Sequence, residues 1–143
     1  MKIRSILAEK GGDVHTIGPD ADAILAAELM KLHQIAALVV TEADTVVGLI
    51  GEREIVHAAA ERRGSIVGRT VGDLMVKRPA TCGPDDLATT IMERMTHKRQ
   101  RHMPVVDGDR LVGVVSLGDM VKSRLGEMEL ESRVLRDTIR TRG

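Results

Sequence analysis

The sequence predicts a mixed α/β fold in which two pseudo-symmetric β-α-β-β-α repeats pack sheet to sheet, followed by a C-terminal helix. Residues 16–57 align without a gap onto residues 81–122, and 12 of these 42 positions are identical. The identical positions are turn formers, apolar core residues and charges. Because a duplicated unit buries its apolar face against its twin, the repeat indicates one two-part body. We expect repeat 1 at residues 1–64, repeat 2 at 65–126 and a helical extension at 127–143.

The first repeat is predicted to contain a short strand, a helix, a hairpin of two strands and a closing helix. The turn Gly18-Pro19-Asp20 starts the first helix, and Gly64 ends the closing helix. Between them, apolar residues first recur at helical spacing and then form two runs separated by a polar turn. The expected ranges are a strand at 14–17, a helix at 21–33, strands at 36–41 and 46–50, and a helix at 52–62.

The second repeat has the same order of elements after a short connector. The connector, residues 64–77, contains a helical turn at 71–75. The expected ranges that follow are a strand at 80–82, a helix at 86–98, strands at 102–106 and 111–116, and a helix from Leu117. The chain is therefore expected to place equivalent pockets in both repeats.

The composition excludes several classes of function. Lys and Arg number 21 and Asp and Glu number 21, so no net charge draws the chain to nucleic acid or to a membrane. The charged N-terminus predicts neither a signal peptide nor a membrane span, and we expect a cytoplasmic protein. Phe, Tyr and Trp are absent, which removes aromatic stacking as a way to hold a base. The single Cys82 and the scattered histidines predict no metal site.

Three blocks of the second half carry a family resemblance. They are Leu74-Met75 with Arg78-Pro79-Ala80-Thr81 and Gly83-Pro84-Asp85, then Arg101-His102-Met103-Pro104-Val105-Val106-Asp107, and then Leu111-Val112-Gly113-Val114-Val115-Ser116-Leu117-Gly118-Asp119. In this order, and duplicated, they resemble a tandem pair of cystathionine-β-synthase (CBS) domains, the Bateman module, in its small stand-alone bacterial form. The resemblance implies a regulatory module that binds adenosyl ligands, such as AMP, ADP, ATP or NAD, in clefts between the repeats.

The four residues Ser116-Leu117-Gly118-Asp119 match the ligand motif Ser/Thr-x-x-Asp of that family. A carboxylate can accept bonds from both ribose hydroxyls, and the start of a helix attracts a phosphate. The same two side chains also fit a capping box that serves only the helix backbone. Both interpretations of Ser116 and Asp119 stay open at the level of the sequence.

Other residues are expected in the walls of the same nucleotide site. The resemblance places Thr81 and the backbone of Pro79 and Ala80 against the base. The remaining candidates are Met103, Pro104 and Val115 for an apolar slot, and Arg101 and His102 for a phosphate clamp. Arg101 and His102 fit a solvated loop equally well.

Repeat 1 departs from the motif, because Gly51 and Glu54 stand where repeat 2 has Ser116 and Asp119. Gly51 has no hydroxyl, and Glu54 carries its carboxylate on a longer arm. A weaker or empty second site is therefore expected at Thr16, Gly51 and Glu54. As a structural alternative, Gly51 caps a helix and Glu54 interacts with its dipole.

The C-terminal segment predicts a helix to about residue 140 with an apolar stripe in near-heptad register. The stripe consists of Val121, Leu125, Met128, Leu135 and Ile139. Because the apolar side chains of this stripe extend past their own domain, a second surface must cover them. We therefore expect a homodimer. Alternatively, Gly126 interrupts the helix and the tail folds back on its own subunit.

The leading hypothesis is a nucleotide-sensing regulatory module that modulates an unidentified protein in trans. The alternative is a structural dimerisation protein without a physiological nucleotide. No nucleophile–base pair or glycine-rich phosphate loop is present in the sequence, so an enzyme is not expected. The expected ligand is an adenine nucleotide, AMP, ATP or NAD, and no catalytic cofactor is predicted.

Overall fold

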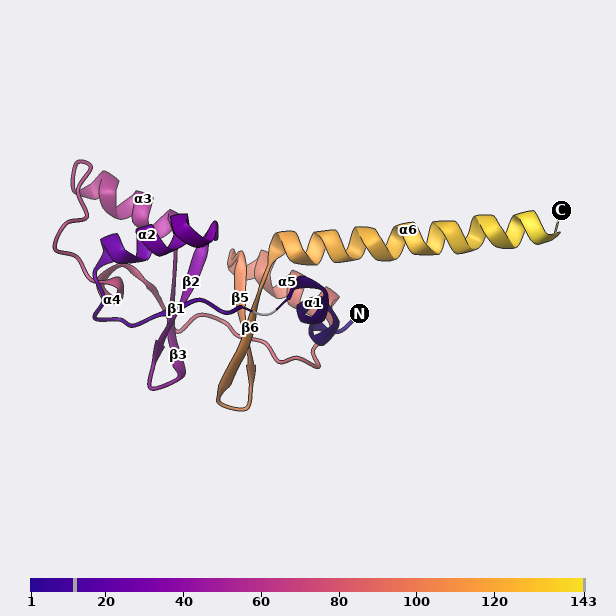
Figure 1. Ribbon diagram of the computed structural model, residues 1–143, viewed down its shortest axis with the longest axis horizontal. Helices are drawn as coiled ribbons and strands as arrows, with labels where there is room; N and C mark the ends of the chain where they lie inside the picture. Colours follow the sequence, from indigo (N-terminus) through magenta and orange to yellow (C-terminus); the bar gives the residue numbers. More distant parts are fainter. Residues whose placement is uncertain (12, 143) are drawn as a thin grey trace.

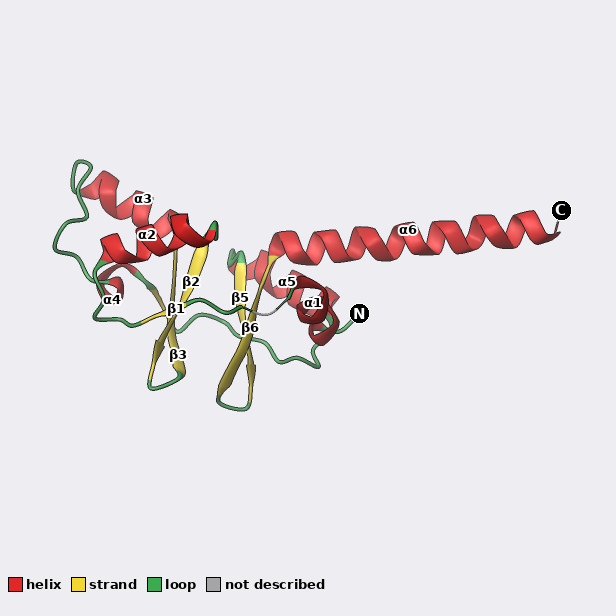
Figure 2. Ribbon diagram, viewed as in Figure 1, coloured by secondary structure: helices red, strands yellow, loops and turns green. Residues whose placement is uncertain are grey.

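The computed structural model describes residues 1–11 and 13–142, and it confirms the mixed α/β fold with two repeats and a long C-terminal helix (Figure 1). Figure 2 shows that each repeat combines a β-hairpin with helices. In chain order the elements are α1 (Ile3–Lys10), β1 (Thr16–Ile17), α2 (Ala23–His33), β2 (Ala37–Glu42), β3 (Thr45–Gly51), α3 (Glu52–Glu61), α4 (Val71–Leu74), β4 (Val76–Lys77), α5 (Ala88–Lys98), β5 (His102–Asp107), β6 (Arg110–Ser116) and α6 (Leu117–Arg142).

The strands form two sheets that meet in the middle of the body. The first sheet has the order β1-β2-β3-β4, with β1 parallel to β2 and the other neighbours antiparallel. The second is the antiparallel pair β5-β6. Both hairpins have a register shift at corresponding positions, Val40/Thr41 and Val105/Val106. The hairpins stand side by side, and β3 contacts β6 (Figure 1).

The strand expected at residues 80–82 is wrong, because only Cys82 pairs with β5, as an isolated parallel bridge to Val105. Pro79 has no N–H for a strand ladder. The side chain of Gln100 bonds both main-chain groups of Ala80, at 3.0 Å and 2.8 Å, and so takes the place of a neighbouring strand. The sequence pattern also gave no indication of α1 or of β4.

The helix ends lie where local capping allows them. The Asp22 carboxylate accepts the backbone N–H of Ile24 at 2.8 Å and so begins α2. α2 and α5 end in left-handed residues at corresponding positions, Gln34 with φ 53° and Arg99 with φ 55°. Equivalent positions in the two repeats therefore fix equivalent helix ends.

The two hydrophobic cores exchange their short helices. Ile3 and Ile6 of α1 pack in the core of repeat 2, whereas Val71 of α4 packs in the core of repeat 1. Backbone bonds hold this exchange: the Ile3 N–H donates to the Asp86 carbonyl at 3.0 Å, and the Val71 N–H donates to the Ala21 carbonyl at 2.8 Å. Each core therefore needs a helix from the other part of the sequence. The division at residues 64/65 stays a prediction about the sequence repeats.

α6 is one continuous helix of 26 residues, so the interruption expected as an alternative at Gly126 is wrong. Its first turns pack on the body, and its remaining turns project away from it (Figure 1). The tail therefore does not fold back on its own subunit. Among the helices of the described residues, none has both the length and the apolar character that crossing a membrane requires.

Candidate functional site

Ser116 and Asp119 lie at the junction of β6 and α6 and cap the helix reciprocally. The Asp119 N–H donates to Ser116 Oγ at 3.0 Å, and the Ser116 N–H donates to Asp119 Oδ2 at 2.9 Å. These two bonds satisfy backbone groups that a helix start otherwise leaves unpaired. The capping role of the motif is thus present in the structure.

Lys10, the last residue of α1, contacts the same carboxylate. Its Nζ donates to Asp119 Oδ2 at 2.7 Å and to the Val114 carbonyl at 2.8 Å. Burial of Asp119 raises its pKa, but the bonds from Lys10 and Ser116 outweigh that effect and hold the pKa below its usual value of 3.8. Asp119 is therefore an ionised carboxylate at neutral pH, with a lysine paired to it.

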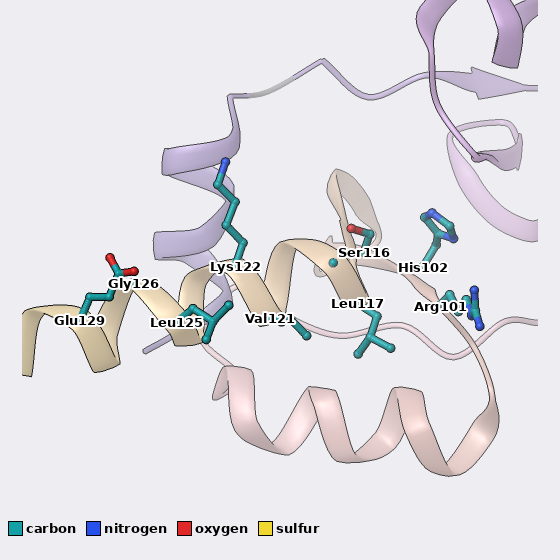
Figure 3. A pocket seen from close by; sticks show the side chains of 10 residues that line it. Arg101, His102, Ser116, Leu117, Val121, Lys122, Leu125, Gly126 and Glu129 are labelled. Carbon is teal, nitrogen blue, oxygen red and sulfur yellow. The ribbon is translucent and has the colours of Figure 1, made fainter.

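A cavity of about 820 Å³ opens beside this junction (Figure 3). Three of the predicted site residues line it: Ser116 at the end of β6, and Arg101 and His102 at the start of β5. The rest of its wall comes from the first three turns of α6, with Leu117, Gly118, Val121, Lys122, Leu125, Gly126 and Glu129. The cavity thus combines a helix start, cationic groups and apolar side chains.

His102 is half-buried between this cavity and a second one. Burial lowers the pKa of His102, and the positive charge of Lys10 acts in the same direction, while Asp119 opposes both. The imidazole is therefore neutral at pH 7. Arg101 and His102 line both of these cavities, so they lie where the two meet.

Three main-chain groups of the segment expected to face a base are occupied by side chains. Gln100 bonds the N–H and the carbonyl of Ala80, and its Nε2 also donates to the His102 carbonyl at 2.9 Å. The carbonyl of Thr81 accepts a bond from Arg94 at 3.3 Å. Pro79, Ala80 and Thr81 line neither cavity.

Two of the three residues expected in an apolar slot, Met103 and Val115, lie in the hydrophobic core of repeat 2 instead. Met103 and Val115 have no exposed surface, and Pro104 is buried beside them on β5. Strand alternation alone does not distinguish a core position from a pocket wall. A direct ligand contact at these residues stays a prediction, as it does for Asp119, which lines neither cavity.

The second cavity, of about 1130 Å³, lies at the corresponding junction of repeat 1. Gly51 and Glu54 line it, whereas Thr16 of β1 does not. A Cβ added to Gly51 would lie 2.9 Å from the Ala36 carbonyl oxygen, so the backbone here excludes a serine like Ser116. The α3 helix accordingly starts without a side-chain cap. The charged residues of this wall are Glu52, Arg53, Glu54, Glu61, Arg69, Asp73, Lys98, Arg99 and Arg101.

Three polar residues around the first site were missed at the level of the sequence: Lys10, Gln100 and Lys122. Lys10 lies 109 positions from Asp119 and outside the repeated block, so no local pattern connects them. Gln100 lies in a basic segment that the sequence pattern predicts as a loop. Its bonds to the main chain of Ala80 exist only because the fold brings residues 80 and 100 together. In the described part of the chain, no three His, Cys, Asp or Glu side chains gather in a way that could hold a metal ion.

Comparison with protein families gives a match to the CBS domain over residues 4–61 and 71–126. The CBS domain-containing protein CBSX3, mitochondrial, of Arabidopsis thaliana is 32% identical over 107 residues, which cover 71% of this chain and 52% of CBSX3. YhcV of Bacillus subtilis is 30% identical over 114 residues, which cover 78% of this chain and 79% of YhcV. The chain thus spans about half the length of one relative and most of the other.

Solved structures of CBS proteins share the fold. ATU1752 from Agrobacterium tumefaciens superposes with a TM-score of 0.82 at 38% identity, over 87% of this chain and 99% of its own. The CBS domain pair of MJ0100, in complex with 5′-methylthioadenosine and S-adenosyl-L-methionine, has a TM-score of 0.79 at 22% identity, over 89% and 98%. CBSX2 in complex with AMP has a TM-score of 0.73 at 19% identity, over 87% and 97%. At these last two identities the likeness is one of fold.

Proposed function

Because this chain belongs to the CBS domain family, with two tandem copies, we propose that it binds an adenosyl nucleotide and thereby regulates a partner protein in trans. The observation that carries the proposal is the cavity at the start of α6, where Ser116, Arg101 and His102 lie together. Its volume of about 820 Å³ falls in the range of ligand pockets, roughly 300–1,000 Å³. The AMP complex of CBSX2 and the adenosyl complexes of MJ0100 support the ligand class.

The phosphate of the nucleotide would lie at the start of α6. The helix dipole favours an anion there. Arg101 and Lys122 line the same cavity and supply cationic donors, and Arg101 can hold a phosphate with two parallel bonds. The ligand is thus expected to be anionic, as AMP, ATP and NAD are.

The ribose would bond the carboxylate of Asp119 and compete there with Lys10. Both described protein partners of that carboxylate, the Ser116 N–H and Lys10 Nζ, bond Oδ2. A ribose hydroxyl can donate to Oδ1 without breaking either bond, and a second hydroxyl needs Lys10 to move. Lys10→Ala is therefore expected to bind nucleotide at least as tightly as the wild type.

A second candidate function is a structural dimerisation module without a nucleotide. It is favoured by the completed capping box, since Ser116 and Asp119 already satisfy each other's backbone. In both candidates the protein forms a homodimer, resides in the cytoplasm and catalyses no reaction, in keeping with its sequence features. The two candidates differ in whether a ligand stabilises the fold.

Thermal melts with AMP, ADP, ATP, NAD and S-adenosylmethionine separate these candidates. A ligand at 100 times its Kd stabilises the native state by about 2.7 kcal/mol. We expect the shift to be lost in Asp119→Ala, with each variant compared to its own ligand-free melt. Asp22→Ala is the matched control, because the Asp22 carboxylate also caps a helix, α2, and lines neither cavity. A shift that survives Asp119→Ala, or no shift with any ligand, contradicts the proposal.

A further inference from the structure

The apolar stripe of α6 is exposed along the whole projecting part of the helix. Its side chains are Val121, Leu125, Met128, Leu135 and Ile139, which keep 43–63% of their surface exposed, and we name them the α6 seam. With Ser132 included, the seam positions follow each other at intervals of four, three, four, three and four residues. This is the a/d spacing of a coiled coil, with Leu125, Ser132 and Ile139 at a and Val121, Met128 and Leu135 at d.

The body of the protein lies on the opposite side of the helix. Met120 is buried in the core of repeat 2, and Ser123 and Glu127 are half-buried against the body. These are c and f positions, which at 100° per residue point away from the a/d face. The seam from Met128 onward therefore faces outward, where a second helix can reach it, whereas Val121 and Leu125 also line the cavity beside Ser116. The CBS domain match ends at residue 126, so most of the seam lies beyond the matched domain.

We infer that the occupant of the seam is α6 of a second copy of this chain, in a parallel, in-register coiled coil. The charges beside the seam identify this partner. In a parallel pair, each g residue faces the e residue five positions further along the other helix. Arg124 then faces Glu129 of the second copy, and Glu131 faces Arg136 of the second copy. Both contacts are attractive, and symmetry doubles them.

An antiparallel pair in which all six seam positions overlap would be repulsive. When Leu125 of one copy is opposite Leu135 of the other, the e residues face e residues and the g residues face g residues. Glu129 would then face Glu129, Glu131 would face Glu131, and Lys122 would face Arg136. Charge complementarity thus favours the parallel pair over the fully overlapping antiparallel pair, and the polar Ser132 at one a position is a known means of fixing register.

Local bonds of the single chain are compatible with this pairing. Arg124 bonds Glu127 of its own helix at 3.0 Å, and Arg136 reaches the Ser132 carbonyl at 3.5 Å. These are exposed contacts that a long side chain exchanges at little cost. Helices in proteins gain most of their stability from tertiary contacts, and the last turns of α6 extend away from the body. A partner helix on the seam would supply such contacts.

Sedimentation equilibrium of the full-length protein and of two matched variants measures the molecular mass in solution and so tests the inference. We expect a dimer whose dissociation constant rises at least about tenfold in Leu135→Glu, because a charge enters the apolar seam. Val134→Glu is the control, since Val134 is 57% exposed one position away, at c. It should leave the dissociation constant within about twofold. A monomeric wild type, or equal effects of the two variants, overturns the inference and would point to a helix of another protein.

Two further variants test the orientation. Glu131→Arg should weaken the dimer and Glu131→Arg/Arg136→Glu should restore it. In the antiparallel pair, Glu131→Arg exchanges one like-charge contact for another and should leave the dimer unchanged. Ser132→Cys should form an interchain disulfide on mild oxidation, since a-position residues of a parallel pair are adjacent. Cys82 is buried and does not compete. A seam-dependent dimer without this disulfide contradicts the parallel arrangement.

The inference rests on the homodimer proposed above and not on the nucleotide. The melting shift with AMP should persist in Leu135→Glu if the protein is a nucleotide sensor. Loss of the dimer and loss of the ligand shift are thus separate outcomes.

Discussion

Replacing Lys10 with alanine is expected to lower the free energy of unfolding by about 1 kcal/mol at neutral pH. Lys10 Nζ bonds Asp119 Oδ2 at 2.7 Å and the Val114 carbonyl at 2.8 Å, so it ties α1 to the start of α6. The side chains of Lys10 and Asp119 keep 38% and 27% exposure, and solvent therefore screens the pair. For a chain of this length the melting temperature should fall by roughly 3 °C.

The defect should depend on pH in a defined direction. The folded-state pKa of Asp119 lies below 3.8, so its ionised form contributes stability above the unfolded-state pKa. This contribution is lost as the pH falls through the folded-state pKa. The difference between wild type and Lys10→Ala should accordingly be full at neutral pH and shrink at pH values below 3.8.

Urea unfolding followed by circular dichroism measures both effects. Arg4→Ala is the matched control, because Arg4 also joins α1 to repeat 2, through Asp85 at 3.1 Å, but the two side chains are 62% and 68% exposed. It should change the stability little. Two results would show that the Lys10–Asp119 pair does not stabilise the fold as stated. One is an equal loss of unfolding free energy in Arg4→Ala and Lys10→Ala, and the other is a Lys10→Ala defect that persists under acidic conditions.

Three other changes have calculable outcomes. Gly126→Ala should stabilise the protein by about 1 kcal/mol in urea unfolding, since a Cβ there meets no atom within 4 Å and alanine favours the helix; a loss would indicate a covered surface. Gln100→Ala should cost about 1–3 kcal/mol, because it leaves the main-chain groups of the half-buried Ala80 without partners; an unchanged midpoint would contradict this role. Cys82 should react with a thiol reagent at pH 8 only after unfolding, since burial raises its pKa to about 12; rapid reaction of the native protein would refute that.

The fold could be predicted from the sequence because its elements have local causes. Apolar spacing and turn residues indicate α2, the two hairpins and α5, and the repeated block indicates their pairing. The strand at 80–82 could not be excluded, since its replacement depends on the side chain of Gln100 across the fold. The packing of α1 in the distant core is likewise a long-range contact that no local pattern encodes.

The site was predictable in part. Ser116, Arg101 and His102 were expected together on neighbouring segments, and they share one cavity. Met103 and Val115 lie on the same strands but on the face that the helices cover, and the sequence contains no signal for which face is covered. The pairing of Asp119 with Lys10 required the exchange of α1 between the repeats. Nucleotide contact at any of these residues awaits the melts with Asp119→Ala.

The exchange of α1 and α4 also constrains how the chain is made and divided. During synthesis, the core of repeat 1 is complete only after Val71 has been made. The core of repeat 2, which contains Ile3 and Ile6, is complete only after Met120 has been made. Such distant contacts slow folding. A polypeptide cut after residue 64 leaves Val71 missing from one core and Ile3 and Ile6 missing from the other. The smallest contiguous piece with a complete core and all strands of its sheet is therefore residues 16–77, which crosses the boundary between the two sequence repeats.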